Sequence, residues 1–367
     1  MVKSKIAFVI PSLYSGGAER VVSTLSNELV GKYEITIITF TEILPFYELD
    51  SRIQVIPCLK TISPSTNRWQ GLKNNYLLYR RIMQIVKKNN IKLLIGFMTS
   101  TNILTVIAGK TLGIPTIISE RIDPTKSQTK TIRKKLRKIV YPKANILVVQ
   151  TQPILEFFLR WIPKQKLIIL PNPLSDSLTE AKKRYSEPKK ENIVLNVGRL
   201  TKQKGQEMLI RTFAKINPNN WKLQLVGEGS EKAFYKQLII DLDMENKIEL
   251  LGLRKDVAEL YQKAKIFAFP SLFEGFPNAL TEAMHLGLAC ISTDCPTGPS
   301  ELIQDGINGY LVPLSDQNAF EEKLASLINN QTLIKEFSNK APTAVSHLES
   351  HNVAKKWDEL INKVILR

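Results

Sequence analysis

Short runs of aliphatic and β-branched residues alternate with segments of helical periodicity along almost the whole chain. This alternation restricts the possible folds more than any other feature, because it is typical of βαβ units built around a parallel sheet. AERVVSTLSNELV and YLLYRRIMQIVKK are examples of the helical segments. The predicted strands are KIAFVIP, EITIITF, KLLIGFM, PTIISE, ANILVVQ, NIVLNVG, WKLQLVG, KIELLG, KIFAFP and LACISTD.

A polar segment without apolar periodicity, LSDSLTEAKKRYSEPKKE, divides these strands into two groups. The chain has 367 residues, 43% of them hydrophobic, so each half is large enough to bury its own core. We predict an α/β fold with two doubly wound Rossmann-like domains, residues 1–185 and 186–350, that face each other across a cleft. Such sheets bind ligands beyond the carboxyl ends of their strands.

The excess of positive charge lies in the first half of the chain. Residues 1–175 contain 26 Lys and Arg against 9 Asp and Glu, whereas residues 176–367 contain 25 of each kind. The segment 126–143 places Ile132, Leu136, Ile139 and Val140 at helical spacing beneath a row of cations. This helix is either a solvated surface helix or a contact with an anionic membrane or lipid phosphate. Nucleic acid is not an expected partner, because interleaved stacking aromatics are lacking.

Cysteine and histidine are scarce, with three of each scattered along the chain. This predicts reduced thiols in the cytoplasm and neither a metal nor a cofactor. The D-x-D sequence at residues 241–243 falls in a predicted helix and is interpreted as surface charge. We expect no leader peptide and no membrane-spanning helix, since no apolar run approaches about 20 residues.

Two loops that follow predicted strands carry candidate anion-binding groups. In SLYSGGAERVV, Gly16 and Gly17 precede a helix expected to begin at about Ala18. That loop is either a plain tight turn or a place where an anion meets free helix amides. In NVGRLTKQKGQEMLI, Arg199 and Lys204 flank a short loop before another helix. Two such cations suit a diphosphate, unless the loop is simply solvated.

A third loop, SLFEGFPNALTEAM, contains two carboxylates, Glu274 and Glu282. Gly275 and Pro277 predict a turn followed at once by a helix, which puts Glu274 in the turn and Glu282 inside the helix. At ~1.5 Å rise per residue the carboxylates are roughly 10 Å apart, near the upper limit for an acid and a base acting on one bond. The spacing better suits carboxylates that hold the hydroxyls at both ends of a sugar nucleotide.

In this order, the GGAE loop, the G-R-L-x-x-x-K-G loop and the E-G-F-P-N-A-L-x-E motif resemble glycosyltransferase family 4, which comprises retaining enzymes of the GT-B fold. ISERIDP and SGGAERVV are similar to bacterial members that build lipid-linked oligosaccharide, amylovoran-type or other exopolysaccharide units. The resemblance implies metal-independent transfer of a hexose or N-acetylhexosamine from a UDP-sugar to a lipid-linked, for example polyprenyl-diphosphate-linked, saccharide at the inner face of the membrane. It also implies that the C-terminal helix, residues 351–367, packs on the first domain.

The resemblance further implies roles for single residues. Arg199 and Lys204 bind the diphosphate, and together with Glu274, which holds donor-sugar hydroxyls, they form the catalytic set. Glu282 holds the ribose. The other implied substrate-binding residues are Gly16 and Gly17 in the first domain, Gly252 and Leu253 at the base, and Gly275, Phe276, Pro277, Asn278, Ala279 and Leu280 around the phosphates.

One residue departs from the family pattern. Many members have a histidine that helps to position the donor sugar where this chain has Arg121. Arginine stays protonated and cannot act as a base. Arg121 is therefore expected to contact a phosphate or an acceptor carboxylate, or else to form a structural ion pair with Glu120 or Asp123.

Two other functions stay open at this point. One is a UDP-sugar epimerase or hydrolase on the same two-domain plan, which needs no acceptor. The other is a binding module without chemistry, in which the basic first half docks on membrane or nucleic acid. The scarcity of histidine agrees with a retaining transferase, because the departing phosphate can accept the proton of the acceptor.

Overall fold

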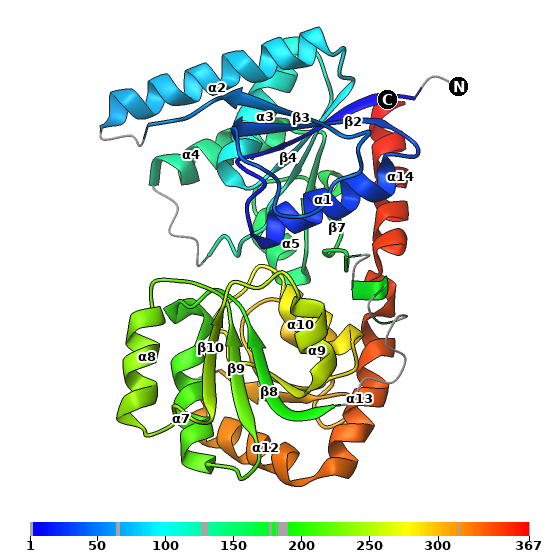
Figure 1. Ribbon diagram of the computed structural model, residues 1–367. Helices are drawn as coiled ribbons and strands as arrows, with labels where there is room; N and C mark the ends of the chain where they lie inside the picture. Colours follow the sequence, from blue (N-terminus) through cyan, green and yellow to red (C-terminus); the bar gives the residue numbers. More distant parts are fainter. Residues whose placement is uncertain are drawn as a thin grey trace. The chain divides into compact units, whose positions relative to one another are not determined.

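The computed structural model describes residues 3–63, 67–125, 131–175, 178–180, 182, 190–314 and 316–366. The chain divides into two compact units: unit 1 is Met1–Ser175 with Ser350–Arg367, and unit 2 is Asp176–Glu349. Each unit has its own parallel sheet with helices on its faces (Figure 1). The predicted α/β class with two Rossmann-like domains is confirmed. Residues 183–189 of the predicted linker lie outside the described residues.

The described strands of unit 1 form one parallel sheet in the order β3-β2-β1-β4-β5-β6-β7. The strand order reverses between β1 and β4, and ligands of open α/β sheets bind at the carboxyl ends of the strands beside such a switch point. The strands are β1 (Lys5–Ile10), β2 (Glu34–Thr41), β3 (Gln54–Leu59), β4 (Leu93–Phe97), β5 (Thr116–Ser119), β6 (Ile146–Val149) and β7 (Leu167–Ile169).

Helices cover both faces of this sheet, because alternate strand side chains point to opposite sides. In β1, Phe8 packs into the core under α1 and α14, whereas Val9 packs against α2 and α3. The described helices of unit 1 are α1 (Gly17–Leu29), α2 (Arg68–Lys88), α3 (Thr99–Leu112), α4 (Thr131–Val140), α5 (Gln152–Leu159) and α14 (Ser350–Ile365), with the 3-10 turns η1 (Tyr141–Lys143) and η2 (Lys164–Lys166).

The C-terminal helix α14 belongs to unit 1, where it lies beside α1 (Figure 1). Its Trp357 is fully buried and stacks on Phe97 of β4, with ring centroids 5.9 Å apart. The hydroxyl of Tyr33 donates a hydrogen bond of 2.6 Å to Asp358, and Lys32 pairs with the same carboxylate at 2.5 Å. The helix therefore completes the core on one face of the first sheet.

The described strands of unit 2 form a parallel sheet in the order β10-β9-β8-β11-β12-β13, with a switch point between β8 and β11. The strands are β8 (Glu191–Val197), β9 (Lys222–Val226), β10 (Ile248–Gly252), β11 (Ala264–Phe269), β12 (Ala289–Asp294) and β13 (Tyr310–Pro313). The helices are α7 (Gln206–Ile216), α8 (Lys232–Asp241), α9 (Val257–Lys263), α10 (Asn278–His285), α11 (Pro299–Leu302), α12 (Gln317–Asn329) and α13 (Gln331–Val345), with η3 (Lys202–Lys204) and η4 (Ser346–Leu348).

The orientation of α4 differs from the prediction. Ile132, Leu136 and Ile139 are 63%, 42% and 60% exposed, whereas Arg137 is 4% exposed. Of the apolar residues predicted to lie beneath the cations, only Val140 is buried, so that expectation is wrong. The core accepts Arg137 instead, because a buried carboxylate lies opposite it. Residues 126–130 of the predicted segment lie outside the described part of the chain.

Candidate active site

The two loops that flank the switch point of unit 2 meet at an ion pair. The loop after β8 carries Lys204 in η3, and the loop after β11 carries Glu274. Their Nζ and Oε1 atoms are 2.6 Å apart, and the side chains are 16% and 7% exposed. The ammonium also lies over the ring of Phe269, 5.4 Å from its centroid. Two of the three predicted catalytic residues are therefore in direct contact, where such sheets bind their ligands.

Tight backbone contacts fix the loop after β8. Gly205 has a φ of 66°, and a Cβ atom there would lie 2.1 Å from the carbonyl oxygen of Pro270. Gln203 exchanges two hydrogen bonds of 2.8 Å with the loop after β11, accepting one from the amide of Leu272 and donating the other to the carbonyl of Phe273. Position 205 therefore requires glycine, and α7 starts directly behind the ion pair.

The turn that carries Glu274 leads straight into α10, which begins at Asn278 and leaves its first amides without intrahelical partners. A loop after β12 supports this turn. The hydroxyl of Thr297 donates to the carbonyl of Glu274, and a Cβ atom on Gly298 would lie 2.4 Å from Cδ of Pro277. Thr297 and Gly298 have φ angles of 76° and 110°. Sequence reasoning missed both residues, for which the available signal was the Thr-Gly-Pro run after a predicted strand.

The second predicted carboxylate, Glu282, lies inside α10 and is 4% exposed. The hydroxyl of Tyr261 lies 3.1 Å from its Oε2 and 3.2 Å from the carbonyl oxygen of Ala279. At the end of the same helix, His285 is also buried, as expected for a core residue. Burial, helped by the positive charge of Lys182, lowers the pKa of His285 to about 4, so its imidazole is neutral near pH 7.

Glycines let three neighbouring strand ends of unit 2 approach closely. Gly198, after β8, donates to the end of β9 over 2.9 Å, and Gly227 donates to Gly252 over 2.8 Å. A Cβ atom on Gly227 would lie 2.1 Å from the carbonyl oxygen of Gly198. A Cβ atom on Gly229 would lie 2.2 Å from the carbonyl oxygen of Leu200, in the same loop after β8. The predicted base-binding residues Gly252 and Leu253 lie at this edge, with Leu253 47% exposed. Gly227 and Gly229 were missed, although Gly-Glu-Gly after a strand signals close backbone approach.

Arg199 lies in the loop between β8 and η3, and its side chain is exposed. Within the described residues it has no hydrogen-bond or ion-pair partner for its guanidinium, whereas its carbonyl accepts a hydrogen bond of 3.0 Å from the buried Gln206. The backbone of Arg199 is thus fixed by a hydrogen bond, while its guanidinium is accessible to solvent. Among the described side chains, no group of three or more His, Cys, Asp or Glu could hold a metal ion.

In unit 1 the loop after β1 lies beside the switch point of that sheet. Helix α1 begins at Gly17, one residue earlier than predicted, with Gly16 as an extended N-cap of φ −169°. A Cβ atom on Gly16 would lie 2.2 Å from a carboxylate oxygen of Glu19 in the first turn. An anionic ligand at these amides would therefore share the helix N-terminus with a carboxylate.

Glu120, directly after β5, is 1% exposed, and its carboxylate finds hydrogen-bond and ion-pair partners within unit 1. Thr99 and Tyr141 donate hydroxyl hydrogen bonds of 2.9 and 2.8 Å to its carboxylate. Nη1 of Arg137, the inward residue of α4, lies 3.8 Å away. Burial raises the pKa of Glu120, and the charge of Arg137 opposes that rise. The ionic partner of Glu120 is therefore Arg137.

One of the two alternatives for Arg121, a structural ion pair with Glu120 or Asp123, is not found among the described residues. Glu120 pairs with Arg137, and Asp123 accepts hydrogen bonds of 2.8 and 2.7 Å from the amide and hydroxyl of Thr125. No carboxylate among the described residues lies within ion-pair distance of Arg121.

The surroundings of the Arg121 guanidinium are aromatic and amide groups. It lies over the ring of Phe97, 4.5 Å from the centroid, and donates a hydrogen bond to Asn172. Its Nε and Nη2 atoms are buried and have no hydrogen-bond partner among the described residues. Burial lowers the pKa of Arg121 to about 9, and the negative charge of the neighbouring Glu120 opposes that fall. The side chain is thus a charged group with unused donors.

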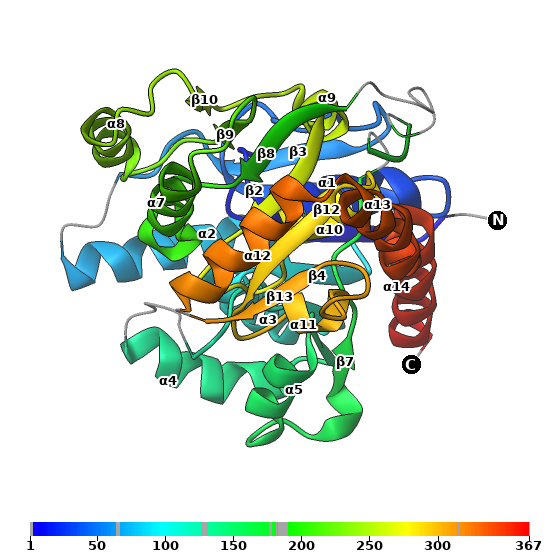
Figure 2. The ribbon, with the colours of Figure 1, turned by 90° about the horizontal axis from the view of Figure 1, so that it is seen from below.

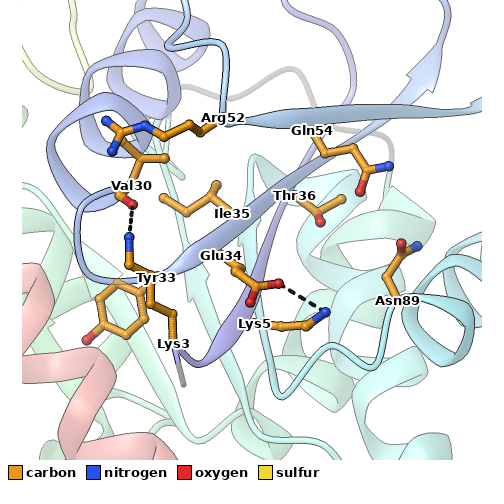
Figure 3. Close-up of a pocket in the computed structure, with 10 residues that line it drawn as sticks. All are labelled: Lys3, Lys5, Val30, Tyr33, Glu34, Ile35, Thr36, Arg52, Gln54 and Asn89. Carbon is orange, nitrogen blue, oxygen red and sulfur yellow. Dashed lines mark hydrogen bonds and ion pairs between the residues drawn. The ribbon is translucent and has the colours of Figure 1, made fainter. Parts of the chain in front are cut away.

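A cavity of about 270 Å³ opens at the amino-terminal ends of the strands in unit 1, away from the ends where the predicted site loops lie (Figure 3). Lys5, Glu34 and Gln54, which line it, are the first residues of β1, β2 and β3, so the cavity lies at the amino ends of the strands. Lys5 pairs with Glu34 at 3.0 Å, and Arg52 pairs with Asp50 at 2.6 Å. None of the predicted site residues lines this cavity.

Two family profiles match adjacent parts of the chain. The profile described as Glycosyltransferase Family 4 matches residues 15–178, and the one described as Glycosyl transferases group 1 matches residues 178–344. The chain is also 30% identical, over 98% of its length and 99% of the relative's, to the "GalNAc-alpha-(1->4)-GalNAc-alpha-(1->3)-diNAcBac-PP-undecaprenol alpha-1,4-N-acetyl-D-galactosaminyltransferase" of Campylobacter jejuni.

Solved structures resemble this chain in fold over almost its whole length. Sucrose-phosphate synthase from Thermosynechococcus elongatus has a TM-score of 0.83 at 18% identity and covers 99% of this chain and 100% of its own. HepE from Anabaena, solved in complex with UDP, has a TM-score of 0.78 at 19% identity and covers 98% and 100%. The comparisons give no support to the epimerase alternative. The chain therefore belongs to glycosyltransferase family 4 and has the GT-B fold.

Proposed function

We propose that this protein is a retaining glycosyltransferase that works without a metal ion. It transfers a hexose or N-acetylhexosamine from a UDP-linked donor to a saccharide carried on polyprenyl diphosphate or another lipid. The Lys204–Glu274 ion pair carries this proposal, because it puts a phosphate-binding cation beside a hydroxyl-binding carboxylate. The name of the Campylobacter relative includes PP-undecaprenol, and HepE was solved with UDP, which supports these substrate classes.

The donor diphosphate binds to the cations and amides around the switch point of unit 2. The ammonium of Lys204 has three donors, of which Glu274 takes one. The remaining donors, the accessible guanidinium of Arg199 and the amides of Phe276, Asn278, Ala279 and Leu280 around the start of α10 bind the two phosphates. Because these groups are held by the surrounding backbone, they stabilise the charge of the leaving nucleotide without reorganising.

Transfer takes place on one face of the donor sugar. The bond between the anomeric carbon and the phosphate oxygen breaks while the acceptor hydroxyl bonds to that carbon from the same side, and its proton passes to the departing phosphate. Glu274 accepts hydrogen bonds from hydroxyls of the donor sugar and orients it for this step. At the other end of the nucleotide, Glu282 holds the ribose, oriented by Tyr261, and the backbone at Gly252 and Leu253 receives the base.

We propose further that the enzyme works at the cytoplasmic face of a membrane, with the segment 126–143 in contact with anionic lipid. The outward apolar stripe of α4 and its exposed cations support this. Among the described helices, none has the length and hydropathy of a bilayer-spanning segment. Attachment is therefore proposed to be peripheral.

The activity is tested by following transfer from UDP-sugars to a short-chain polyprenyl-diphosphate saccharide. We expect an α-linked product from an α-linked donor, observed by NMR of the new anomeric proton, and the same rate with and without EDTA. UDP release without acceptor should be slow. A β-linked product or loss of the rate in EDTA would contradict the proposed mechanism, and rapid turnover without acceptor would point to a hydrolase.

Arg121 is proposed to contact a phosphate of the acceptor, which supplies the hydrogen-bond acceptors that its Nε and Nη2 lack. Arg121→Gln removes a partly buried cation that has no carboxylate within ion-pair distance among the described residues, so we expect the free energy of unfolding to rise by roughly 1–2 kcal/mol. The KM for the lipid acceptor should rise by about tenfold to a hundredfold. Urea unfolding and steady-state kinetics measure the two effects. A variant that is less stable with an unchanged acceptor KM would assign Arg121 a purely structural role.

A further inference from the structure

Aromatic and apolar side chains gather on two neighbouring loops of unit 1. Tyr14, in the loop after β1, is 57% exposed, and the centroid of its ring lies 6.4 Å from that of Phe46, in the loop after β2. Tyr47 contacts the ring of Phe46 edge to face, with centroids 5.1 Å apart. Leu44, in the same loop, is 89% exposed. We refer to Tyr14, Leu44, Phe46 and Tyr47 together as the aromatic cluster.

Hydrogen bonds hold both loops in place. The amide of Phe46 donates a bond of 2.9 Å to the carbonyl of Leu13, which joins the two loops directly. The side chain of Asn27 in α1 donates to the carbonyl of Glu48 over 3.1 Å and accepts from the amide of Asp50 over 2.9 Å. Helix α1 is itself packed against α14, which lies beside it in both views (Figures 1 and 2). The rings are therefore carried on a fixed backbone.

The aromatic cluster lies at the edge of the sheet where α/β proteins bind ligands. Its two loops leave the carboxyl ends of β1 and β2, and β1 borders the switch point with β4. Tyr14 belongs to the same short loop as Gly16, directly before α1. The cluster is therefore placed for substrate binding, whereas the cavity beside Lys5 and Glu34 lies at the amino ends of the strands.

The charge around the aromatic cluster is opposite to that of the rest of the first half of the chain. Four of the nine Asp and Glu of residues 1–175 fall in the segments 11–19 and 41–51, namely Glu19, Glu42, Glu48 and Asp50. Neither segment contains Lys or Arg. Arg52, the next residue after the second segment, pairs with Asp50. Phosphate groups, nucleic acids and anionic lipids are bound through cations, so none of them suits the cluster.

A neutral saccharide matches this combination of groups. The C–H groups on the face of a pyranose ring carry partial positive charge and stack on the negative face of an aromatic ring. Carboxylates accept hydrogen bonds from sugar hydroxyls. A stable protein interface takes about 20–30 residues on each side, many more than the cluster contains. The cluster therefore fits a small polyhydroxyl ligand better than a protein partner.

We propose that the aromatic cluster binds the acceptor saccharide, with an uncharged sugar ring stacked on Tyr14. This rests on the proposed function, in which Arg121 of unit 1 contacts a phosphate of the acceptor, and it adds which residues hold the glycan. Strands β1 and β5 lie on either side of β4, so the loops that carry Tyr14 and Arg121 leave strands about 10 Å apart. One lipid-linked saccharide can therefore contact both residues.

Tyr14→Ala is expected to raise the KM for a short-chain, water-soluble polyprenyl-diphosphate saccharide by about tenfold, because the stacking surface is lost. The kcat at saturating acceptor and the Kd for UDP should stay within about twofold of the wild type, since the change affects acceptor binding alone. Tyr14→Phe keeps the ring and should behave like the wild type. Tyr76→Ala is the control, because Tyr76 of α2 is also 57% exposed in unit 1; its acceptor KM should not change.

Three results would overturn the proposal. The first is an acceptor KM that Tyr14→Ala leaves unchanged. The second is the same rise in KM for Tyr76→Ala, which would show that the loss of any exposed ring of unit 1 has this effect. The third is a rise for Tyr14→Phe as large as that for Tyr14→Ala, which would assign the effect to the hydroxyl rather than to stacking.

Tyr14→Trp places a fluorescent ring in the aromatic cluster and tests contact without relying on activity. The emission of this variant, compared with the wild type, should change when the acceptor is added, and also when its free saccharide is added at higher concentration. Polyprenyl diphosphate without sugar and UDP should leave the emission unchanged. A response to the lipid diphosphate alone would assign the cluster to the carrier, and a response to UDP would assign it to the donor. Either response, or none to saturating acceptor, overturns the proposal.

The acidic segments give a separate test of the uncharged sugar. Two acceptors are compared that differ only in the terminal sugar, a hexose or the corresponding uronic acid. At low salt we expect the wild type to have a KM about fivefold higher for the uronic acid, because like charges repel. E42Q/E48Q should narrow this difference to about twofold. A wild type that favours the uronic acid, or a difference that the variant does not change, overturns the assignment of a neutral sugar.

Fluorescence and kinetics together separate failure of the aromatic cluster from failure of the proposed function. If the wild type transfers no sugar from any UDP-sugar, the proposed function fails, and the emission of Tyr14→Trp still decides whether the cluster binds saccharide. If the wild type transfers sugar while Tyr14→Ala keeps the wild-type KM and Tyr14→Trp does not respond to acceptor, the cluster fails alone.

Discussion

Replacing Lys204 by alanine is expected to lower kcat for sugar transfer by roughly 10²- to 10³-fold, as for the loss of one fixed group that stabilises a developing anion. Lys204 also neutralises Glu274, whose side chain is only 7% exposed. Loss of the cation should therefore lower the free energy of unfolding of unit 2 by roughly 3 kcal/mol. Initial rates with a saturating UDP-sugar and urea unfolding measure the two effects.

Lys202 provides a matched control for this substitution. It is a cation of the same 3-10 turn, it is exposed, and the described residues offer it no ion-pair partner. Lys202→Ala removes the same formal charge from the same loop, so long-range electrostatics change equally in both variants. We expect its kcat to stay within about twofold of the wild type, because exposed charges contribute little. Equal losses in the two variants would show that Lys204 acts through net charge alone.

Three of the four edge strands were the part of the fold that the sequence did not reveal. The ten predicted strands all form, but β3, β7 and β13 were not predicted. All three lie at the edges of their sheets. Two of them contain a proline, Pro57 and Pro313, and β7 has only three residues. An edge strand pairs on one side only, so it tolerates proline and needs no long apolar run, and its sequence resembles a loop.

The site was predicted in its residue types but not in its contacts. Lys204 and Glu274 were assigned separate tasks, and nothing local in the sequence indicates that residues so far apart form an ion pair. Thr297 and Gly298 were missed for the same reason, since a contact with the Glu274 turn makes their backbone conformation necessary. Local patterns predict helices and turns, but they do not show which loops a sheet brings together.

Arginines were the hardest residues to place from sequence. Arg137 belongs to a run of cations that looks uniformly solvent-exposed, yet it is buried against Glu120. Consequently Arg121, for which an ion pair with Glu120 was one predicted alternative, has no carboxylate within ion-pair distance among the described residues. Helical periodicity places Arg137 beside Val140, but hydropathy argues against burying a cation. Whether Arg137 is buried depends on the position of a carboxylate from another element, Glu120.

Glu274→Gln should have an effect as large as that of Lys204→Ala, but of a different kind. The amide has nearly the shape of the carboxylate and loses its charge, so it binds sugar hydroxyls less strongly. We expect kcat to fall by roughly 10²- to 10³-fold, since the effect is confined to the reacting end of the donor. Affinity for UDP should stay the same or rise, because a carboxylate no longer balances the positive charge of Lys204. Calorimetry with UDP and steady-state kinetics measure the two quantities.

Glu282→Gln is the companion variant, and the contrast between the two carboxylates separates their roles. If Glu282 holds the ribose, its loss weakens UDP binding by about tenfold, as expected when one hydrogen bond to a charged group is lost, while kcat at saturating donor changes little. If Glu274 merely holds Lys204 in place, Glu274→Gln weakens UDP binding as Lys204→Ala does. In that case the double variant should be no slower than Lys204→Ala alone. A carboxylate that acts on the sugar instead adds its loss of rate to that of Lys204→Ala.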